Sequence, residues 1–198
     1  MIRLFPIIIS AFTILSATII NVPSDYSTIQ EGINASVDGD TVLVAQGNYI
    51  ENLVLEKEIV LASHAIYDDL GTDWISNEHV ANTKIIGGSP TNTKKGSCIQ
   101  ISYGNIQPTI MGFTVSNGLG TSMIIDDCGI SRTERSGGAI MAFQAYPILS
   151  YNRFIGNGAP ALNTDNALLA TQNGGAITLY DDDDVEFDED RNGSEENN

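Results

Sequence analysis

The last eleven residues of the chain, DEDRNGSEENN, space their oxygen-bearing side chains as calcium-binding loops do. Asp188, Asp190 and Asn192 alternate along this stretch, and Gly193 and Glu196 follow them. Alternate side chains of such a loop converge on one cation, and glycine permits the sharp turn. Asp188, Asp190, Asn192 and Glu196 are therefore the predicted metal ligands, and Ca²⁺ is the predicted cofactor. A full calcium loop would place its last ligand one position beyond residue 198, so the motif is either truncated or uses Glu196 earlier. The alternative is an acidic disordered tail, which the preceding DDDD run favours.

A second group of charged residues lies in the long segment between Gly118 and Ser136. Paired carboxylates beside arginines can hold Ca²⁺ and bind a uronate, a combination that polysaccharide lyases use. Mixed charges in a long loop are more often solvated surface, so no residue is predicted to be catalytic. The residues concerned are Asp126, Asp127, Arg132, Glu134 and Arg135.

The polar stretch around residues 63–83 holds the two histidines, His64 and His79, together with Tyr67 and Trp74. No nucleophile motif accompanies the histidines, and their spacing is not that of a zinc site. The two aromatic rings can stack on sugar faces. The alternative is that they pack against the fold.

Cys98 and Cys128 belong to no metal-spacing motif. In an exported protein they can form one disulfide, and two independent thiols are the alternative.

The net charge indicates which partners this protein can have, and the N-terminal sequence indicates where it is located. The net charge is −16, and residues 181–198 contribute −9 of it from ten acids and one arginine. Such a chain repels phosphate and anionic lipid heads, so no nucleic-acid partner is expected.

Arg3 and the apolar run after it predict a signal peptide over residues 1–17, with a buried strand or an uncleaved anchor as alternatives. No later run approaches the ~20 apolar residues of a membrane span. We expect a secreted or cell-surface protein.

The segment after the leader predicts one strand and one short helix. IINV reads as a strand that ends at Pro23. Ser27 and Gln30 are spaced as a capping box, which satisfies free amides at a helix start. Apolar residues then recur every four positions, at Ile29, Ile33 and Val37, which gives the helix one apolar face.

The rest of the chain predicts strands and turns that repeat. GSCI at 96–99 returns as GGAI at 137–140 and again at 174–177, and PTIMGFTVSNG at 108–118 returns as PILSYNRFIGNG at 147–158 with one residue inserted. Repeats that bury an apolar face only by stacking define a solenoid. Three short strands per unit of about 22 residues indicate a parallel β-helix. An all-β sandwich is the rival, but hairpins would not explain the repeated positions.

Two further expectations follow from this stacking. Corner asparagines such as Asn117 and Asn157 tolerate left-handed geometry and should hydrogen-bond their equivalents in the next coil. Apolar residues at repeated coil positions should form one continuous core. The predicted core residues are Val42, Val44, Leu53, Leu55, Val60, Ile99, Ile101, Val115, Ile140 and Ile155.

These motifs resemble a known family. STIQEGINASVDGDTVLVAQGNYIENLVLEKEIVLAS is similar to the opening coil of pectin-lyase-like right-handed parallel β-helix proteins, and the later repeats resemble those of large secreted bacterial proteins of this type. The resemblance spans about residues 19–180. It implies an all-β, right-handed, single-stranded parallel β-helix over residues 18–180, with an N-terminal capping helix and an acidic tail at 181–198.

GNYIE, from Gly47 to Glu51, matches the Gly-x-Tyr-x-Glu pattern of pectin esterases, but none of their later catalytic segments is recognisable here. We interpret it as scaffold, in which Gly47 suits a corner, Tyr49 packs inward and Glu51 satisfies backbone amides at a turn.

The expected function is therefore a non-catalytic extracellular module of a secreted or cell-surface protein, one that binds polysaccharide or cell-surface glycans or adheres to other cells. The alternative is a calcium-dependent enzyme acting on acidic polysaccharide. We also expect the chain to be the front portion of a longer protein, because GGAI opens a coil and the calcium-like pattern is incomplete at the same end.

Overall fold

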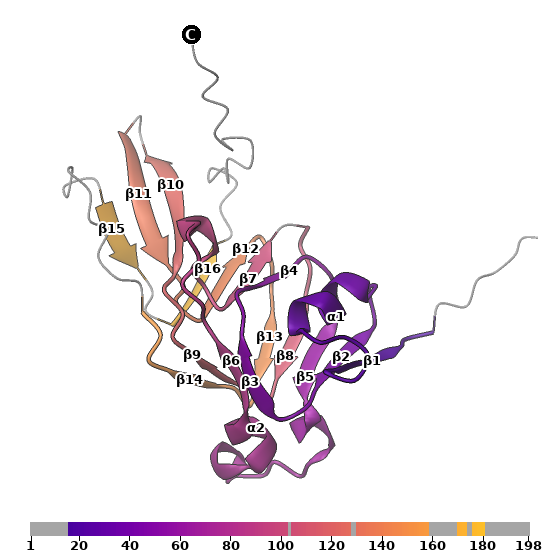
Figure 1. Cartoon of the computed structure of the whole chain (residues 1–198). Coiled ribbons are helices and arrows are strands. Elements are labelled where there is room, and N and C mark those ends of the chain that lie inside the picture. The colour runs from indigo at the N-terminus through magenta and orange to yellow at the C-terminus, as the bar shows by residue number, and fades with distance from the viewer. Residues whose placement is uncertain (1–15, 103, 128–129, 159–169, 174–175, 181–198) are drawn as a thin grey trace, which may run out of the picture.

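The computed structural model describes residues 16–102, 104–127, 130–158, 170–173 and 176–180. In these ranges the protein is mostly β-structure with a few short helices (Figure 1). Three sheets make up the body, and neighbouring strands in each run parallel. Sheet A contains β1 (Ile19–Val22), β2 (Thr41–Val44), β5 (Val60–Ser63), β8 (Thr109–Met111) and β13 (Ile148–Ser150). Sheet B contains β3 (Gly47–Ile50), β6 (Thr83–Ile86), β9 (Thr114–Ser116) and β14 (Arg153–Ile155). Sheet C contains β4 (Leu53–Leu55), β7 (Ile99–Ser102), β12 (Ile140–Phe143) and β16 (Ile177–Tyr180).

The chain visits sheets A, B and C in turn, and we call each such passage a circuit. The first circuit is β2-β3-β4, the second β5-β6-β7, the third β8-β9-β12 and the fourth β13-β14-β16. Strands that follow one another in sequence thus lie in different sheets. The expected all-β fold with parallel strands is confirmed. The rival sandwich of hairpins is wrong for the body of the protein.

The repeat predicted the register of sheet C. Ile140 of β12 pairs with Ile99 of β7 on one side and with Ile177 of β16 on the other, so the three repeated tetrapeptides stack on one another. The second repeat behaves in the same way, because Ile148 pairs with Thr109 and Phe154 pairs with Val115. One residue per circuit therefore occupies each repeated position.

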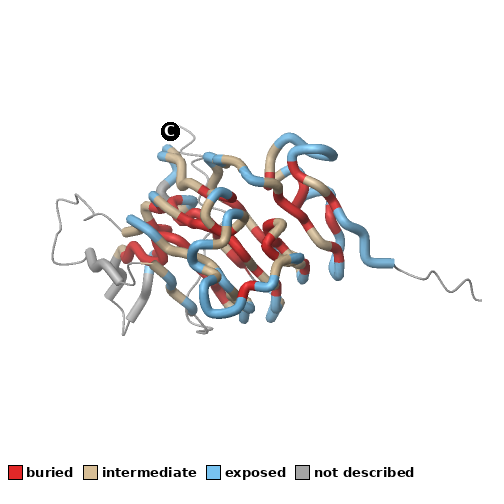
Figure 2. Tube along the Cα trace, turned by 90° about the horizontal axis from the view of Figure 1, so that it is seen from below, coloured by how far each residue is buried: buried red, intermediate tan, exposed pale blue. Residues whose placement is uncertain are grey.

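The core lies between the three sheets, where buried segments of successive circuits stack (Figure 2). The predicted core residues Val42, Val44, Leu53, Leu55, Ile99, Ile101, Val115 and Ile140 are all buried. The expectation was wrong for two residues. Val60 is only half-buried and Ile155 is 48% exposed, while their neighbours Leu61 and Phe154 pack into the core instead. Successive side chains of a strand point to opposite faces. Because Leu61 and Phe154 face the core, Val60 and Ile155 beside them face outward.

Helix α1 (Ile29–Ala35) covers the end of the body at which the first circuit begins (Figure 1). Its capping box is formed by Thr28 and Glu31, one residue later than the predicted pair. Ile29 and Ile33 are buried as expected, but Val37 lies beyond the helix and is 49% exposed. The predicted capping helix is present, although the capping residues and the last apolar position were wrong.

Three side chains from the first circuit and the helix join α1 to the sheets. The carboxylate of Glu51 accepts hydrogen bonds from the first amides of the helix, and Lys57 Nζ donates to the carbonyls of Ile33, Asn34 and Ser36 at 2.8, 2.8 and 2.6 Å. The Gln30 amide bonds both the N–H and the C=O of Val54 in β4, at 2.8 and 3.1 Å. Because Gln30 takes the place of a strand partner, it satisfies the edge of sheet C at this end.

The chain is lengthened mainly where it passes between sheets. Residues 64–82 are inserted between sheets A and B of the second circuit, and residues 87–98, 117–139 and 156–176 are inserted between sheets B and C of the last three.

The segment between Gly118 and Ser136, which was expected to be a charged loop, forms a hairpin instead. β10 (Thr121–Asp127) and β11 (Ile130–Ser136) pair antiparallel, and β15 (Ala170–Asn173) adds to β11 as a small sheet that projects from the body (Figure 1).

Corner asparagines hydrogen-bond backbone rather than each other. Asn157 accepts from the amide of Gly118 at 2.9 Å and donates to the carbonyl of Val115 at 2.9 Å, both in the preceding circuit. Asn52 makes the same pair of contacts with Gly88 and Ser97 of the next circuit, at 3.0 and 2.8 Å. The expected link between circuits is confirmed, but its partner was wrong, because a backbone amide and carbonyl satisfy both ends of the side-chain amide.

Candidate binding site

The 64–82 insertion, which we call the lobe, is built from three short helices. They are η1 (His64–Tyr67), η2 (Trp74–Ser76) and α2 (Glu78–Asn82). Asn77 caps α2, because its side-chain oxygen accepts from the amides of His79 and Val80 at 2.9 and 3.1 Å. Ser63 caps η1 in the same way through the amide of Ala65. The hydrophobic period was too short to predict these helices, and the capping residues were the only available signal.

The lobe is held firmly against the body. Ala65, Leu70 and Val80 form a buried cluster against which Trp74 and Met111 pack, and Met111 belongs to the third circuit. Thr114 of β9 also donates a hydrogen bond from its hydroxyl to the carbonyl of Val80, at 2.8 Å. Side chains on the lobe are thus carried by a packed element, which favours their use as a preorganised surface.

A polar cluster holds the middle of the lobe together. Asp68 Oδ2 lies 2.7 Å from His79 Nδ1 and accepts a hydrogen bond from Asn77 Nδ2 at 2.9 Å. These hydrogen bonds, that from His79 first, lower the pKa of Asp68 below its ordinary value. The ring of His64 lies beside that of His79, with 5.8 Å between ring centroids. Asp68 therefore stays ionised and fixes the orientation of the His79 ring.

Trp74 links the lobe to the fourth circuit. Its ring meets that of Tyr151 edge to face, with centroids 5.8 Å apart, and Tyr151 is 41% exposed. Trp74 also borders an open cavity of about 360 Å³. The polar residues that border this cavity are Asp69, Thr72, Asp73, Ser76 and Asn77. An aromatic ring beside several hydrogen-bonding groups suits a sugar, which presents an apolar ring face and polar hydroxyl groups.

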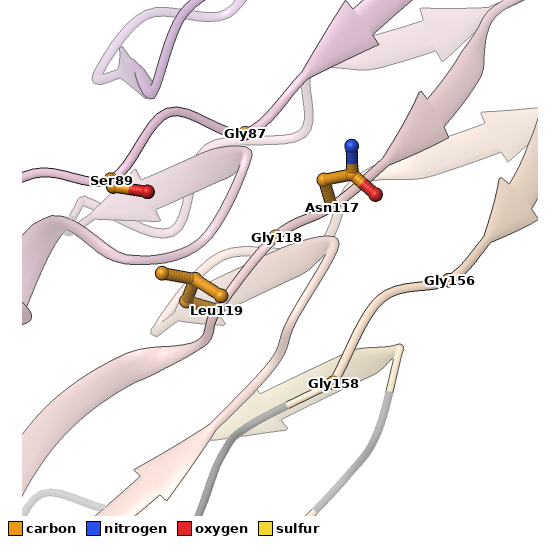
Figure 3. A pocket seen from close by; sticks show the side chains of 7 residues that line it. All are labelled: Gly87, Ser89, Asn117, Gly118, Leu119, Gly156 and Gly158. Carbon is orange, nitrogen blue, oxygen red and sulfur yellow. The ribbon is translucent and has the colours of Figure 1, made fainter.

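A second hollow, of about 560 Å³, runs along the passage from sheet B to sheet C. It is lined largely by glycine backbone from three successive circuits, with Asn117 at its centre (Figure 3). Packing explains two of these glycines, Gly87 and Gly118. A side chain at Gly118 would collide with the carbonyl of Gly138, and one at Gly87 would lie 2.6 Å from the carbonyl of Asn117. Among the described residues neither an aromatic nor a charged side chain lines this hollow, so the lobe is the stronger candidate.

The contacts predicted for Tyr49 and Glu51 of GNYIE are present. Tyr49 packs against the core, and its hydroxyl donates to the carbonyl of Ala45 at 3.0 Å. Glu51 accepts from the amides of Ile29 and Gln30, so its carboxylate serves the helix cap. Gly47 is the first residue of β3, directly after the passage from sheet A.

The charged residues of the hairpin are not gathered at one place. Glu134 and Arg135 are buried at its base, where they pair with Met123 and Ser122 of β10, and Ser136 donates to Glu134 at 3.0 Å. The backbone register puts the other three toward the tip, because Asp126, Asp127 and Arg132 pair with Ser131, Ile130 and Ile125. The expectation of an exposed loop that carries all five was wrong.

The remaining sequence candidates have separate outcomes. Cys98 is a buried free thiol, 3.2 Å from the carbonyl of Ser116, and Cys128 lies outside the described residues. Burial raises the pKa of Cys98 to about 11. The predicted calcium ligands Asp188, Asp190, Asn192 and Glu196 also lie outside the described residues, as does most of the predicted signal peptide.

The described part of the chain offers neither a metal cluster nor a membrane-spanning helix. No group of three or more histidine, cysteine or acidic side chains in it is placed to hold a metal ion. None of the helices in the same ranges has both the length and the apolar content needed to cross a bilayer.

Comparison with protein-family models and with curated proteins finds no match for this chain. The geometry therefore carries the functional argument. Sequence reasoning had singled out Trp74, but it missed Tyr151, Asp69 and Asp73. Tyr151 comes from the fourth circuit, and no local pattern indicates that it meets the lobe.

Proposed function

We propose that this protein is a non-catalytic extracellular module that binds a glycan through the lobe. Its circuits are proposed to form a right-handed single-stranded parallel β-helix of the pectin-lyase-like type, which the resemblance of the opening coil supports. Secretion to the cell exterior is supported by the signal-peptide pattern at residues 1–17. A calcium role for Asp188, Asp190, Asn192 and Glu196 remains part of the proposal.

The observation that carries the proposal is the cavity beside Trp74. Trp74 borders it together with two acidic residues and the hydroxyl residues Thr72 and Ser76. Glycan recognition needs an apolar surface for the ring face and polar groups for the hydroxyls, and this cavity supplies both. The lobe packs against Met111, and its Val80 carbonyl accepts a hydrogen bond from the Thr114 hydroxyl, so the walls are held before a ligand arrives.

The non-catalytic part of the proposal rests on how the candidate groups are used. Glu51, the acid of the esterase-like motif, is hydrogen-bonded to the amides of α1. Asp68 is engaged by His79 and Asn77. Cleavage of a glycosidic bond needs an acid, a base and charge stabilisation at one place, and these carboxylates serve structural contacts instead.

Trp74 is the only tryptophan of the chain, so its fluorescence reports directly on the cavity. Titration with soluble oligosaccharides of several classes should change that emission in a saturable manner. Tyr151 does not border the cavity, but its ring packs edge to face on that of Trp74, so Tyr151→Ala should weaken the binding measured by calorimetry by releasing the indole. Trp74→Phe should also weaken it, and it preserves a ring against Leu70 and Val80 better than alanine does.

Tyr26→Ala is the matched control, because Tyr26 is a similarly exposed aromatic outside the lobe. It should bind as the wild type does. If no class of oligosaccharide binds, or if Tyr151→Ala and Trp74→Phe bind unchanged, the proposal is wrong. Calcium-dependent release of unsaturated sugars from pectate would instead support the enzymatic alternative.

A further inference from the structure

The lobe carries only one sign of permanent charge. Residues 64–82 contain four acids and neither lysine nor arginine. Of the four, Asp69 and Asp73 border the cavity beside Trp74, whereas Asp68 is engaged by His79 and Asn77. A ligand in this cavity therefore meets two acidic side chains and an aromatic ring.

We propose that the lobe selects glycans that carry amino groups, and that it disfavours uronates. This inference rests on the proposed glycan-binding function and names the ligand class for the same cavity. Asp69 and Asp73 are both exposed, and the described residues give neither carboxylate a hydrogen-bond partner. The two carboxylates are thus available to a ligand.

The chemistry of an amino sugar fits these walls. Its pyranose ring has an apolar face that packs on the indole of Trp74, and its ammonium group donates hydrogen bonds to carboxylates. An ammonium close to an indole face is further stabilised by the ring quadrupole. A uronate brings a negative charge to the same walls and is repelled by them.

The cationic groups near the lobe do not reverse this preference. Lys84 follows the lobe in β6 and Arg153 begins β14, but neither borders the cavity. His79 faces Asp68, and His64 lies beside His79.

The experiment compares two ligands of equal length that differ at the amino group, which is free and cationic in one and acetylated and neutral in the other. Fully deacetylated and fully N-acetylated glucosamine oligomers of equal length are titrated into the whole protein by calorimetry, with oligogalacturonate as the anionic ligand. The deacetylated oligomer should bind about fivefold more tightly than the acetylated one, as expected for one or two solvent-exposed ion pairs. Added salt should reduce this difference, because it screens exposed charges.

The double variant Asp69→Asn, Asp73→Asn is isosteric and should bind both glucosamine oligomers equally. Its matched control is Glu56→Gln, which removes an exposed acid outside the lobe and should keep the fivefold difference. If the wild type binds the two glucosamine oligomers equally, or if it prefers oligogalacturonate, the inference is wrong while glycan binding stands. If no oligomer of any class binds, both the inference and the proposed function are overturned.

Discussion

The carboxylate of Glu51 lies 3.0 Å from the backbone nitrogen of Gln30, and it makes an equally short contact with the nitrogen of Ile29. A residue at the end of β3 thus satisfies two free amides at the start of α1. A negative charge at this position also interacts favourably with the positive end of the helix dipole. The esterase-like motif has a structural use here, because its acid fixes the helix that covers the first circuit.

Replacing Glu51 should therefore destabilise the protein. Glu51→Ala should lower the free energy of unfolding by about 1–2 kcal/mol, as the loss of a helix cap commonly does. Glu51→Gln keeps one acceptor oxygen and should cost less. Urea unfolding followed by circular dichroism measures both changes. Glu56→Gln, at an exposed position in the same segment, should be neutral, and an equal effect of all three variants would contradict the capping role.

Charge inside the stacked core should unfold the protein. Ile140 is fully buried between Ile99 and Ile177 in sheet C, so Ile140→Asp would bury a charge that has no partner. We expect no cooperative thermal transition for this variant, and a loss of about 2–5 kcal/mol for Ile140→Ala. Ile155→Asp is the control, because Ile155 is 48% exposed and should tolerate the change. Equal stability of the two aspartate variants would refute the register.

Cys98 should be chemically inert in the folded protein. Burial raises the pKa of its thiol to about 11, and only the thiolate reacts quickly with thiol reagents. In a Cys128→Ser background, modification by a disulfide reagent should be slow near neutral pH and fast after urea is added. The raised pKa also means that stability falls as the pH rises from the ordinary thiol value toward about 11, since the unfolded chain loses its proton first. Rapid labelling of the native protein would contradict this prediction.

Asp40 should contribute to the acid sensitivity of the fold. Its carboxylate accepts from the amide of Val37 at 2.9 Å and from that of Thr18 at 2.8 Å, and these contacts hold the pKa of Asp40 below its ordinary value of 3.8. A lowered folded pKa gives stability that is present above 3.8 and is lost as the pH falls through the folded value. Asp40→Asn should make the free energy of unfolding, measured by urea denaturation, less dependent on pH below 3.8. If the variant loses stability at acid pH as the wild type does, other carboxylates account for the acid sensitivity.

The repeated tetrapeptides allowed the register of sheet C to be predicted from sequence, since equal residues at Ile99, Ile140 and Ile177 mark equal positions in successive circuits. Apolar triplets were harder to interpret. In Ile59-Val60-Leu61 every residue is apolar, so the alternation that separates the core face from the outer face is absent. The inward position of Leu61 follows only from its stacking against Val42 and Ile110.

The candidate site was less accessible to prediction than the fold. Trp74 stood out because it is an aromatic residue in a polar stretch, as Tyr67 is, but its contact with Tyr151 joins the second circuit to the fourth. Such contacts depend on how far a loop reaches along the stack, which local propensity does not encode. The hairpin at 121–136 was missed for a different reason. Its charged residues suggested a solvated loop, whereas Glu134 and Arg135 are buried at its base.

The distribution of connection lengths has a consequence for how this protein tolerates change. The links from sheet C to sheet A span only residues 56–59, 103–108 and 144–147, whereas those from sheet B to sheet C lengthen to 87–98, 117–139 and 156–176. Lengthening a loop is thermodynamically mild, at about 0.6 kcal/mol for each doubling, and the strand ladders keep their register. Foreign peptides grafted between sheets B and C should therefore be displayed without refolding of the body, which makes that side of the molecule suited to engineering and the other side unsuited to it.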